Sequence, residues 1–300
     1  MNHIRLSRAA RVLAGTAALC VLAVAGCSNA PKVTAANEVA LPKQPSKIVS
    51  LSPTATESLF AIGAGGQVKA ADSLSNYPSV APDTTLSAFN LNIEAVAKFK
   101  PDLVILSSDT SPGKDALAGF KKLKIPVLIQ PAAKNIDEVY EQILQLGVAT
   151  GRSKDANKLV GLMRKQIAEA VKAANPGQGI KIFHEVDSTL YTATSDTFIG
   201  SVYKAFGLEN IADAAATADA QGYPQLTSEY IVKANPMVVF LGDSTYGTTY
   251  DNLAVRPGWD QVDAVRMRFV VPLDSDIASR WGPRVVELYK AVGKAIPALK

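Results

Sequence analysis

Histidine, the most frequent general base and a common metal ligand, is almost absent from this chain. Of its two histidines, His3 falls in an N-terminal segment that we expect to be removed, which leaves His184. Zinc or manganese sites built from three histidines are therefore excluded for the mature chain. His184-Glu185 also lacks the second histidine of an HExxH motif. We interpret His184 as a core or cleft-edge histidine, with a haem or iron ligand as the alternative.

No recognisable nucleophile or nucleotide motif accompanies His184. A GxSxG elbow is missing, because Gly242-Asp243-Ser244-Thr245 is followed by Tyr246. The run Gly63-Ala64-Gly65-Gly66 is not GxGxxG, and no Walker A motif occurs. A Ser-His-Asp triad would have to use His184, which lies in an apolar stretch. These patterns favour a binding protein over an enzyme.

Residues 1–26 are typical of a bacterial signal peptide. A basic start is followed by an apolar run over 12–25, which is shorter than the roughly 20 residues needed to cross a bilayer. Val24-Ala25-Gly26-Cys27 resembles a lipobox, in which the cysteine is acylated and the chain is cut before it. The pattern predicts lipidation at Cys27 and an extracytoplasmic protein anchored to the bacterial cell membrane. Plain secretion is the alternative.

The mature chain is nearly neutral. Three of the 31 basic residues (Arg5, Arg8 and Arg11) lie in the signal peptide, which leaves 28 against 27 acidic residues. This balance gives no case for nucleic-acid binding. Cys27 is the one cysteine left, so no intramolecular disulfide is expected. Residues 27–45 are rich in Ala, Asn, Pro, Lys and Thr without periodicity, which predicts a flexible tether.

The elements that must position any site alternate between strand and helix. We predict strands at 47–51, 68–71, 103–106, 126–129, 180–186, 237–241 and 268–273. We predict helices at 54–62, 93–99, 114–123, 136–149, 198–206, 228–234 and 283–296. This alternation indicates parallel α/β layers. Thr54-Ala55-Thr56-Glu57 fits a capping box, so Glu57 is predicted to cap a helix rather than to act as a catalytic acid.

One helix separates two similar halves. Residues 153–175 carry apolar side chains at helical spacing over five turns, and Asn175-Pro176-Gly177 ends the pattern. On either side, residues 93–106 and 228–241 share five of 14 residues at a constant offset of 135. This repeat predicts two homologous lobes. The predicted organisation is an N-terminal lobe (46–152), a bridging helix (153–175) and a C-terminal lobe (176–300), with a ligand cleft at the strand ends.

Several stretches resemble the iron-chelate/cobalamin solute-binding proteins of bacterial ABC importers. They are 47–57, 75–78, 92–94 with 100–104, 223–229 and 279–284. Each motif is modest, but their order and spacing are specific, and the resemblance covers about residues 45–296. It implies two three-layer α/β lobes bridged by one long helix, with limited hinge motion. This agrees with the reading of residues 153–175 above.

The resemblance also implies site residues. The two permease-docking glutamates of the family correspond to Glu94 and Glu229. Similarity to the cobalamin-binding member implies two groups of ligand contacts in this chain. One is an aromatic wall at Phe89 and Tyr223 with Tyr77 nearby, and the other is a polar pair at Asp276 and Arg280. Ferric-siderophore binders use Arg, Tyr and Trp in similar loops, which Arg280, Trp281, Tyr246 and Tyr250 could supply. Each of these residues has a structural alternative, such as core packing or helix-dipole complementarity.

The implied function is that of a substrate-binding lipoprotein, a monomer, which captures a metal chelate and delivers it to a dimeric permease. Where the cobalamin-binding member has a tryptophan after the third strand, this chain has Leu106-Ser107-Ser108-Asp109. The sequence therefore leaves a corrinoid and a ferric siderophore both open as the transported ligand. A haem receptor of the same type and a surface enzyme acting on such a chelate are the alternatives. No resident cofactor is expected.

Overall fold

The computed structural model describes residues 44–110, 112–174 and 179–296, which belong to one compact unit. The predicted signal peptide, Cys27 and nearly all of the predicted tether lie outside the described residues. Asn175, at the end of the predicted bridging helix, also lies outside them. Among the described residues, no helix is long and apolar enough to cross a membrane.

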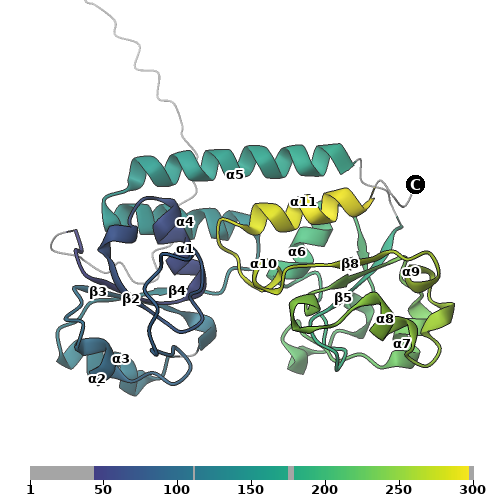
Figure 1. The fold of residues 1–300 in the computed structure, drawn as a ribbon, viewed down its shortest axis with the longest axis horizontal. Helices are drawn as coiled ribbons and strands as arrows, with labels where there is room; N and C mark the ends of the chain where they lie inside the picture. The colour runs from purple at the N-terminus through teal and green to yellow at the C-terminus, as the bar shows by residue number, and fades with distance from the viewer. Residues whose placement is uncertain (1–43, 111, 175–178, 297–300) are drawn as a thin grey trace, which may run out of the picture. The chain divides into compact units, whose positions relative to one another are not determined.

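Each half of the described chain folds as alternating strands and helices (Figure 1). The first half contains β1 (Ile48–Leu51), α1 (Pro53–Ala61), β2 (Val68–Ala71), α2 (Ile93–Ala97), β3 (Leu103–Ser107), α3 (Lys114–Lys122), β4 (Val127–Gln130) and α4 (Ile136–Thr150). After α5 (Ser153–Ala174) come β5 (Lys181–Glu185), α6 (Phe198–Ala205), β6 (Glu209–Asn210), α7 (Ser228–Ala234), β7 (Val238–Leu241), α8 (Tyr250–Ala254), α9 (Asp263–Arg266), β8 (Val270–Pro272), α10 (Ser275–Ser279) and α11 (Val285–Ala295).

The two sheets have the same topology. The first has the strand order β2-β1-β3-β4 and the second β6-β5-β7-β8, and every pairing is parallel. The central pairs also correspond in register: Leu103 of β3 lies opposite β1, and Val238 of β7, at the 135-residue offset, lies opposite β5. The internal repeat found in the sequence therefore extends to the spatial order of the strands in each sheet.

Alternate strand residues pack on opposite faces of each sheet, as expected for strands covered on both sides. In β7, Val238 and Phe240 join one apolar cluster, whereas Val239 and Leu241 join another. The strands of the first half divide in the same way between the shared cluster and a cluster of their own. Each half is therefore a three-layer α/β arrangement, and the predicted fold class is confirmed.

Helix α5 bridges the two halves by packing on a helix of each. It lies alongside α4 and α11 (Figure 1), and its buried residues are Ala156, Val160, Met163, Ile167 and Ala174. Small residues permit close approach: a Cβ on Gly147 of α4 would lie 2.5 Å from the Cβ of Ala156, and one on Gly293 of α11 would lie 3.1 Å from the carbonyl oxygen of Ala170. The apolar cluster under α5 contains residues of both halves, so hinge motion would have to deform one continuous core.

The predicted strands and long helices are found within two residues at either end. Asn92 and Asn135 cap α2 and α4. The short elements β6, α8, α9 and α10 were not predicted, because two to five residues carry too little periodicity to be read. The lobe boundaries at residues 152 and 176 remain predictions.

Candidate functional site

Exposed aromatic side chains collect in the loops that follow the carboxyl ends of the strands. Among the described residues, the exposed ones in these loops are Tyr77, Phe89, Tyr191, Tyr223 and Tyr246. Phe99, between α2 and β3, is exposed at the opposite edge of the first sheet. In parallel sheets the carboxyl-end edge is where ligands bind. Exposed aromatic rings at that edge offer a surface for a large, partly apolar molecule.

Phe89 and Tyr223, the predicted aromatic wall, are 67% and 41% exposed. Burial raises the pKa of the Tyr223 hydroxyl, and the carboxylate of Asp109 raises it further, while a hydrogen bond with Thr197 lowers it. Asp109 follows β3 of the first half and Tyr223 follows β6 of the second. The loop after β2, which also carries Phe89, reaches the second half directly, because Asn76 in that loop hydrogen-bonds to Asp276.

Tyr191 is an exposed aromatic that the sequence analysis missed. Its backbone forms an antiparallel bridge with Gln225, and the Thr192 amide donates to the Pro224 carbonyl. Tyr191 and Tyr223 therefore stand on the same two-stranded ribbon and are equally exposed. The sequence does show an aromatic residue in the loop after a predicted strand. That pattern alone does not tell whether the side chain is buried in the core or exposed on the surface.

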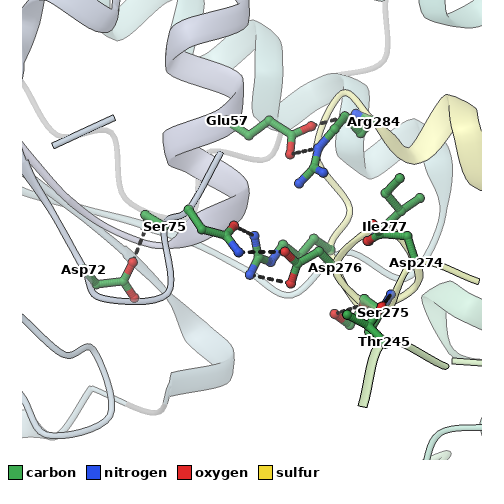
Figure 2. A network of polar contacts seen from close by, with 12 residues as sticks. Glu57, Asp72, Ser75, Thr245, Asp274, Ser275, Asp276, Ile277 and Arg284 are labelled. Atoms are coloured by element: carbon green, nitrogen blue, oxygen red, sulfur yellow. Dashed lines mark hydrogen bonds and ion pairs between the residues drawn. The ribbon is translucent and has the colours of Figure 1, made fainter. Parts of the chain in front are cut away.

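The predicted polar pair, Asp276 and Arg280, is joined by a third residue from the other half. Arg280 Nη2 lies 2.7 Å from Asp276 Oδ1. The Asn76 side chain donates from Nδ2 to Asp276 Oδ2 at 2.8 Å and accepts from Arg280 Nη1 at 2.6 Å (Figure 2). Asn76 follows β2, whereas Asp276 belongs to α10. The pair is therefore not free, and it is part of a bridge between the two halves.

Glu57 forms a second bridge and does not cap its helix. Ser52, whose side chain accepts from the Ala55 amide, is the N-cap of α1. The Glu57 carboxylate instead accepts from the Arg284 backbone amide and from Arg284 Nε, both at 2.7 Å (Figure 2). The capping-box prediction was wrong because α1 begins at Pro53, one residue before the predicted start, so Glu57 is its fifth residue and not the third that a capping box requires. The Arg284 guanidinium also lies over the Tyr77 ring, 3.9 Å from its centroid.

Tyr77 and Trp281 are thus engaged within the protein. Tyr77 lines a pocket of about 440 Å³ together with residues of α1, α5 and α11. Trp281 is partly buried against the shared core, with its ring 6.2 Å from that of Phe198. Tyr250 donates its hydroxyl to the Val265 carbonyl and carries Arg268 over its ring. Of the aromatic residues expected at a ligand, Tyr246 and Phe89 are the most exposed, followed by Tyr77 and Tyr223 at similar exposure.

Glu94 and Glu229 occupy equivalent places in the two halves. Each is exposed and lies in the first turn of its helix, α2 or α7. Within the described residues, neither carboxylate forms an ion pair. Beside Glu229 is a mainly apolar pocket of about 500 Å³, lined by Ser228, Val232, Lys233, Pro257 and Gly258.

His184 is a buried core residue. Its Nδ1 lies 2.7 Å from the Tyr203 hydroxyl, and burial lowers its pKa to about 4, so the imidazole is neutral at physiological pH. The described residues contain no group of three His, Cys, Asp or Glu side chains placed to hold a metal ion. The core interpretation of His184 is the one that this environment supports.

Comparison with known proteins places these features in a family. The family described as periplasmic binding protein matches residues 48–277. An uncharacterized ABC transporter substrate-binding lipoprotein of Bacillus subtilis, YvrC, is 34% identical over 266 residues, which cover 86% of this chain and 82% of the relative. The vitamin B12-binding protein of Pectobacterium carotovorum is 25% identical over 85% of this chain and 90% of its own length.

The fold is also found in solved structures. A possible iron-binding, periplasmic solute-binding protein of Staphylococcus epidermidis superimposes with a TM-score of 0.72 at 27% identity, covering 85% of this chain and 99% of that one. The family match spans both halves, including the loops that carry the exposed aromatic residues. The chain therefore belongs to the periplasmic binding protein family.

Proposed function

We propose that this protein is the substrate-binding component of an ABC importer and that it captures a metal chelate, a corrinoid or a ferric siderophore, between its two halves. The observation that carries the proposal is the set of exposed aromatic residues at the carboxyl ends of both sheets, next to the Asp276–Arg280 pair. A large ring-bearing ligand suits aromatic walls with a few polar groups that fix its orientation. Relatives named as vitamin B12-binding and iron-binding proteins support the ligand class.

Replacing Phe89 and Tyr223 by alanine should weaken chelate binding. Fully burying one such side chain is worth about 1.5–3 kcal/mol, so each substitution should raise Kd roughly tenfold to a hundredfold. Titration of the purified protein with cyanocobalamin and with a ferric catecholate, followed by fluorescence, measures the change. Phe99→Ala is the matched control, because Phe99 is exposed at the other edge of the sheet. Equal losses in all three variants would contradict this placement of the ligand.

We further propose that acylation of Cys27 holds the protein at the outer face of the cell membrane, with residues 27–45 as a tether. Support comes from the lipobox-like Val24-Ala25-Gly26-Cys27 and from a relative named as a lipoprotein. Cys27→Ala should abolish incorporation of a labelled fatty acid and release the protein from membranes. Cys20→Ala, in the segment expected to be removed, should leave the label unchanged. Label of equal intensity in Cys27→Ala and wild type would refute the anchor.

A further inference from the structure

Three side chains close a ring of polar contacts between the two halves. Asn76 donates to Asp276 and accepts from Arg280, and Arg280 in turn pairs with Asp276, at distances of 2.8, 2.6 and 2.7 Å. Asp276 lies in α10 and Arg280, four residues later, is the residue directly after the helix, whereas Asn76 is 200 residues distant from Asp276. Asp276 and Arg280 therefore together bind one polar group, which here is the primary carboxamide of Asn76.

The chemistry of the pair selects that group. A carboxamide is neutral and has a donor and an acceptor side by side, so it can give a hydrogen bond to Asp276 while receiving one from Arg280. A carboxylate could replace the contact with Arg280, but its second oxygen would face an oxygen of Asp276 and repel it. The buried carboxylate of Asp72 also acts on Arg280, which makes the surroundings less favourable to an anion.

The Asn76 side chain can leave the pair without disturbing the fold. The residue is exposed, while the side chains of Arg280 and Asp276 beside it are only 14% and 28% exposed. The loop is anchored by its neighbour Ser75, which donates to Asp72 (Figure 2). Ser75 also shares a hydrogen bond with Thr56. Rotation of the Asn76 side chain alone would therefore uncover the pair.

We propose that the Asn76 carboxamide occupies the Asp276–Arg280 pair in place of a primary carboxamide of the ligand, which displaces it on binding. This rests on the proposed function, because it requires that a chelate bind between these loops. Corrinoids carry primary carboxamide side chains around the corrin ring, whereas haem carries propionates and catecholate siderophores bind iron through anionic oxygens. The pair therefore favours a corrinoid among the candidate chelates. Asn76 lowers the apparent affinity for that corrinoid, because its side chain must be displaced first.

The test compares three probes on two variants that lack the carboxamide, Asn76→Ala and Asn76→Ser. A ligand that must displace an internal group binds with an affinity reduced by the fraction of protein already open. Because the Asn76 contacts are charge-assisted, we expect cyanocobalamin to bind both variants roughly tenfold more tightly than wild type, mainly through faster association. The affinities of both variants for haemin and for a ferric catecholate should differ from those of wild type by less than about twofold. Asn90→Ala, an exposed asparagine of the same loop, should behave as wild type.

The outcomes separate this inference from the function on which it rests. Unchanged or weaker cyanocobalamin binding by both Asn76 variants would overturn the displacement, because Asn76 would then be a bystander or a ligand contact. A wild-type protein that binds the ferric catecholate but not cyanocobalamin would overturn the inference and leave the chelate-binding function in place. A wild-type protein that binds none of the three probes would overturn both.

Discussion

Replacing Glu94 and Glu229 together by alanine should abolish uptake while ligand binding stays intact. The two exposed carboxylates lie at equivalent positions of the repeated halves, and α5 with its shared core holds those halves together. We propose that these two anions, in fixed positions, engage two cationic patches of a dimeric permease at the same time. Losing one partner of an interfacial charge pair costs roughly 2–5 kcal/mol, a loss in docking affinity of about 30-fold or more.

Cells that express each variant would be assayed for accumulation of the labelled chelate, and the purified proteins for ligand affinity. Each single variant should transport poorly and the double variant worst, with no change in Kd for the ligand. Their stability should fall by under about 1 kcal/mol per residue, the usual contribution of an acid in the first turn of a helix. Glu141→Ala, an exposed glutamate within α4, controls for loss of charge alone. Wild-type transport by the double variant would remove the docking role.

Arg256→Ala should lower the free energy of unfolding by about 3–5 kcal/mol, because it leaves a buried carboxylate without its partner. Arg256 donates from both terminal nitrogens to Glu185, at 2.6 and 2.7 Å. The Glu185 side chain is fully buried and that of Arg256 is 17% exposed. The guanidinium also lies over the Trp259 ring, 4.7 Å from its centroid. The substitution therefore removes a charge pair and a packed cation together.

The loss of unfolding free energy in Arg256→Ala should be larger at neutral than at acidic pH. Burial raises the pKa of Glu185, and hydrogen bonds from Arg256 oppose the rise. Without Arg256 the folded-state pKa lies further above the unfolded value. Such an acid costs stability as the pH rises through its folded-state pKa, so the deficit should be largest at neutral pH and should shrink on acidification.

Urea denaturation of the variants at neutral and acidic pH measures both effects. The double variant Glu185→Gln/Arg256→Ala should be more stable than Arg256→Ala at neutral pH, because no unpaired charge remains buried. Arg266→Ala breaks the exposed pair with Asp263 and should cost under about 1 kcal/mol. If Arg256→Ala cost no more than Arg266→Ala, the buried pair would not be a major source of stability.

Local patterns predicted those features that depend on neighbours in the sequence. Apolar spacing located the long helices and strands, and asparagines marked the starts of α2 and α4. Asp276 and Arg280 meet because residues four apart lie on one face of a helix. The 135-residue repeat anticipated the shared topology of the sheets. Each of these rests on backbone geometry with a short, fixed period, which is why the sequence alone determined them.

Partners distant in the sequence were decided only by the tertiary structure. Nothing local indicates that Asn76 meets Asp276, that Glu57 turns from its own helix to Arg284, or that Glu185 is paired with Arg256. The same holds for Trp281, an expected ligand contact whose ring packs near Phe198. Which charged groups meet depends on how loops from two sheets are brought together. A buried carboxylate takes the donor that this assembly supplies, because a charge left buried without a partner is strongly destabilising.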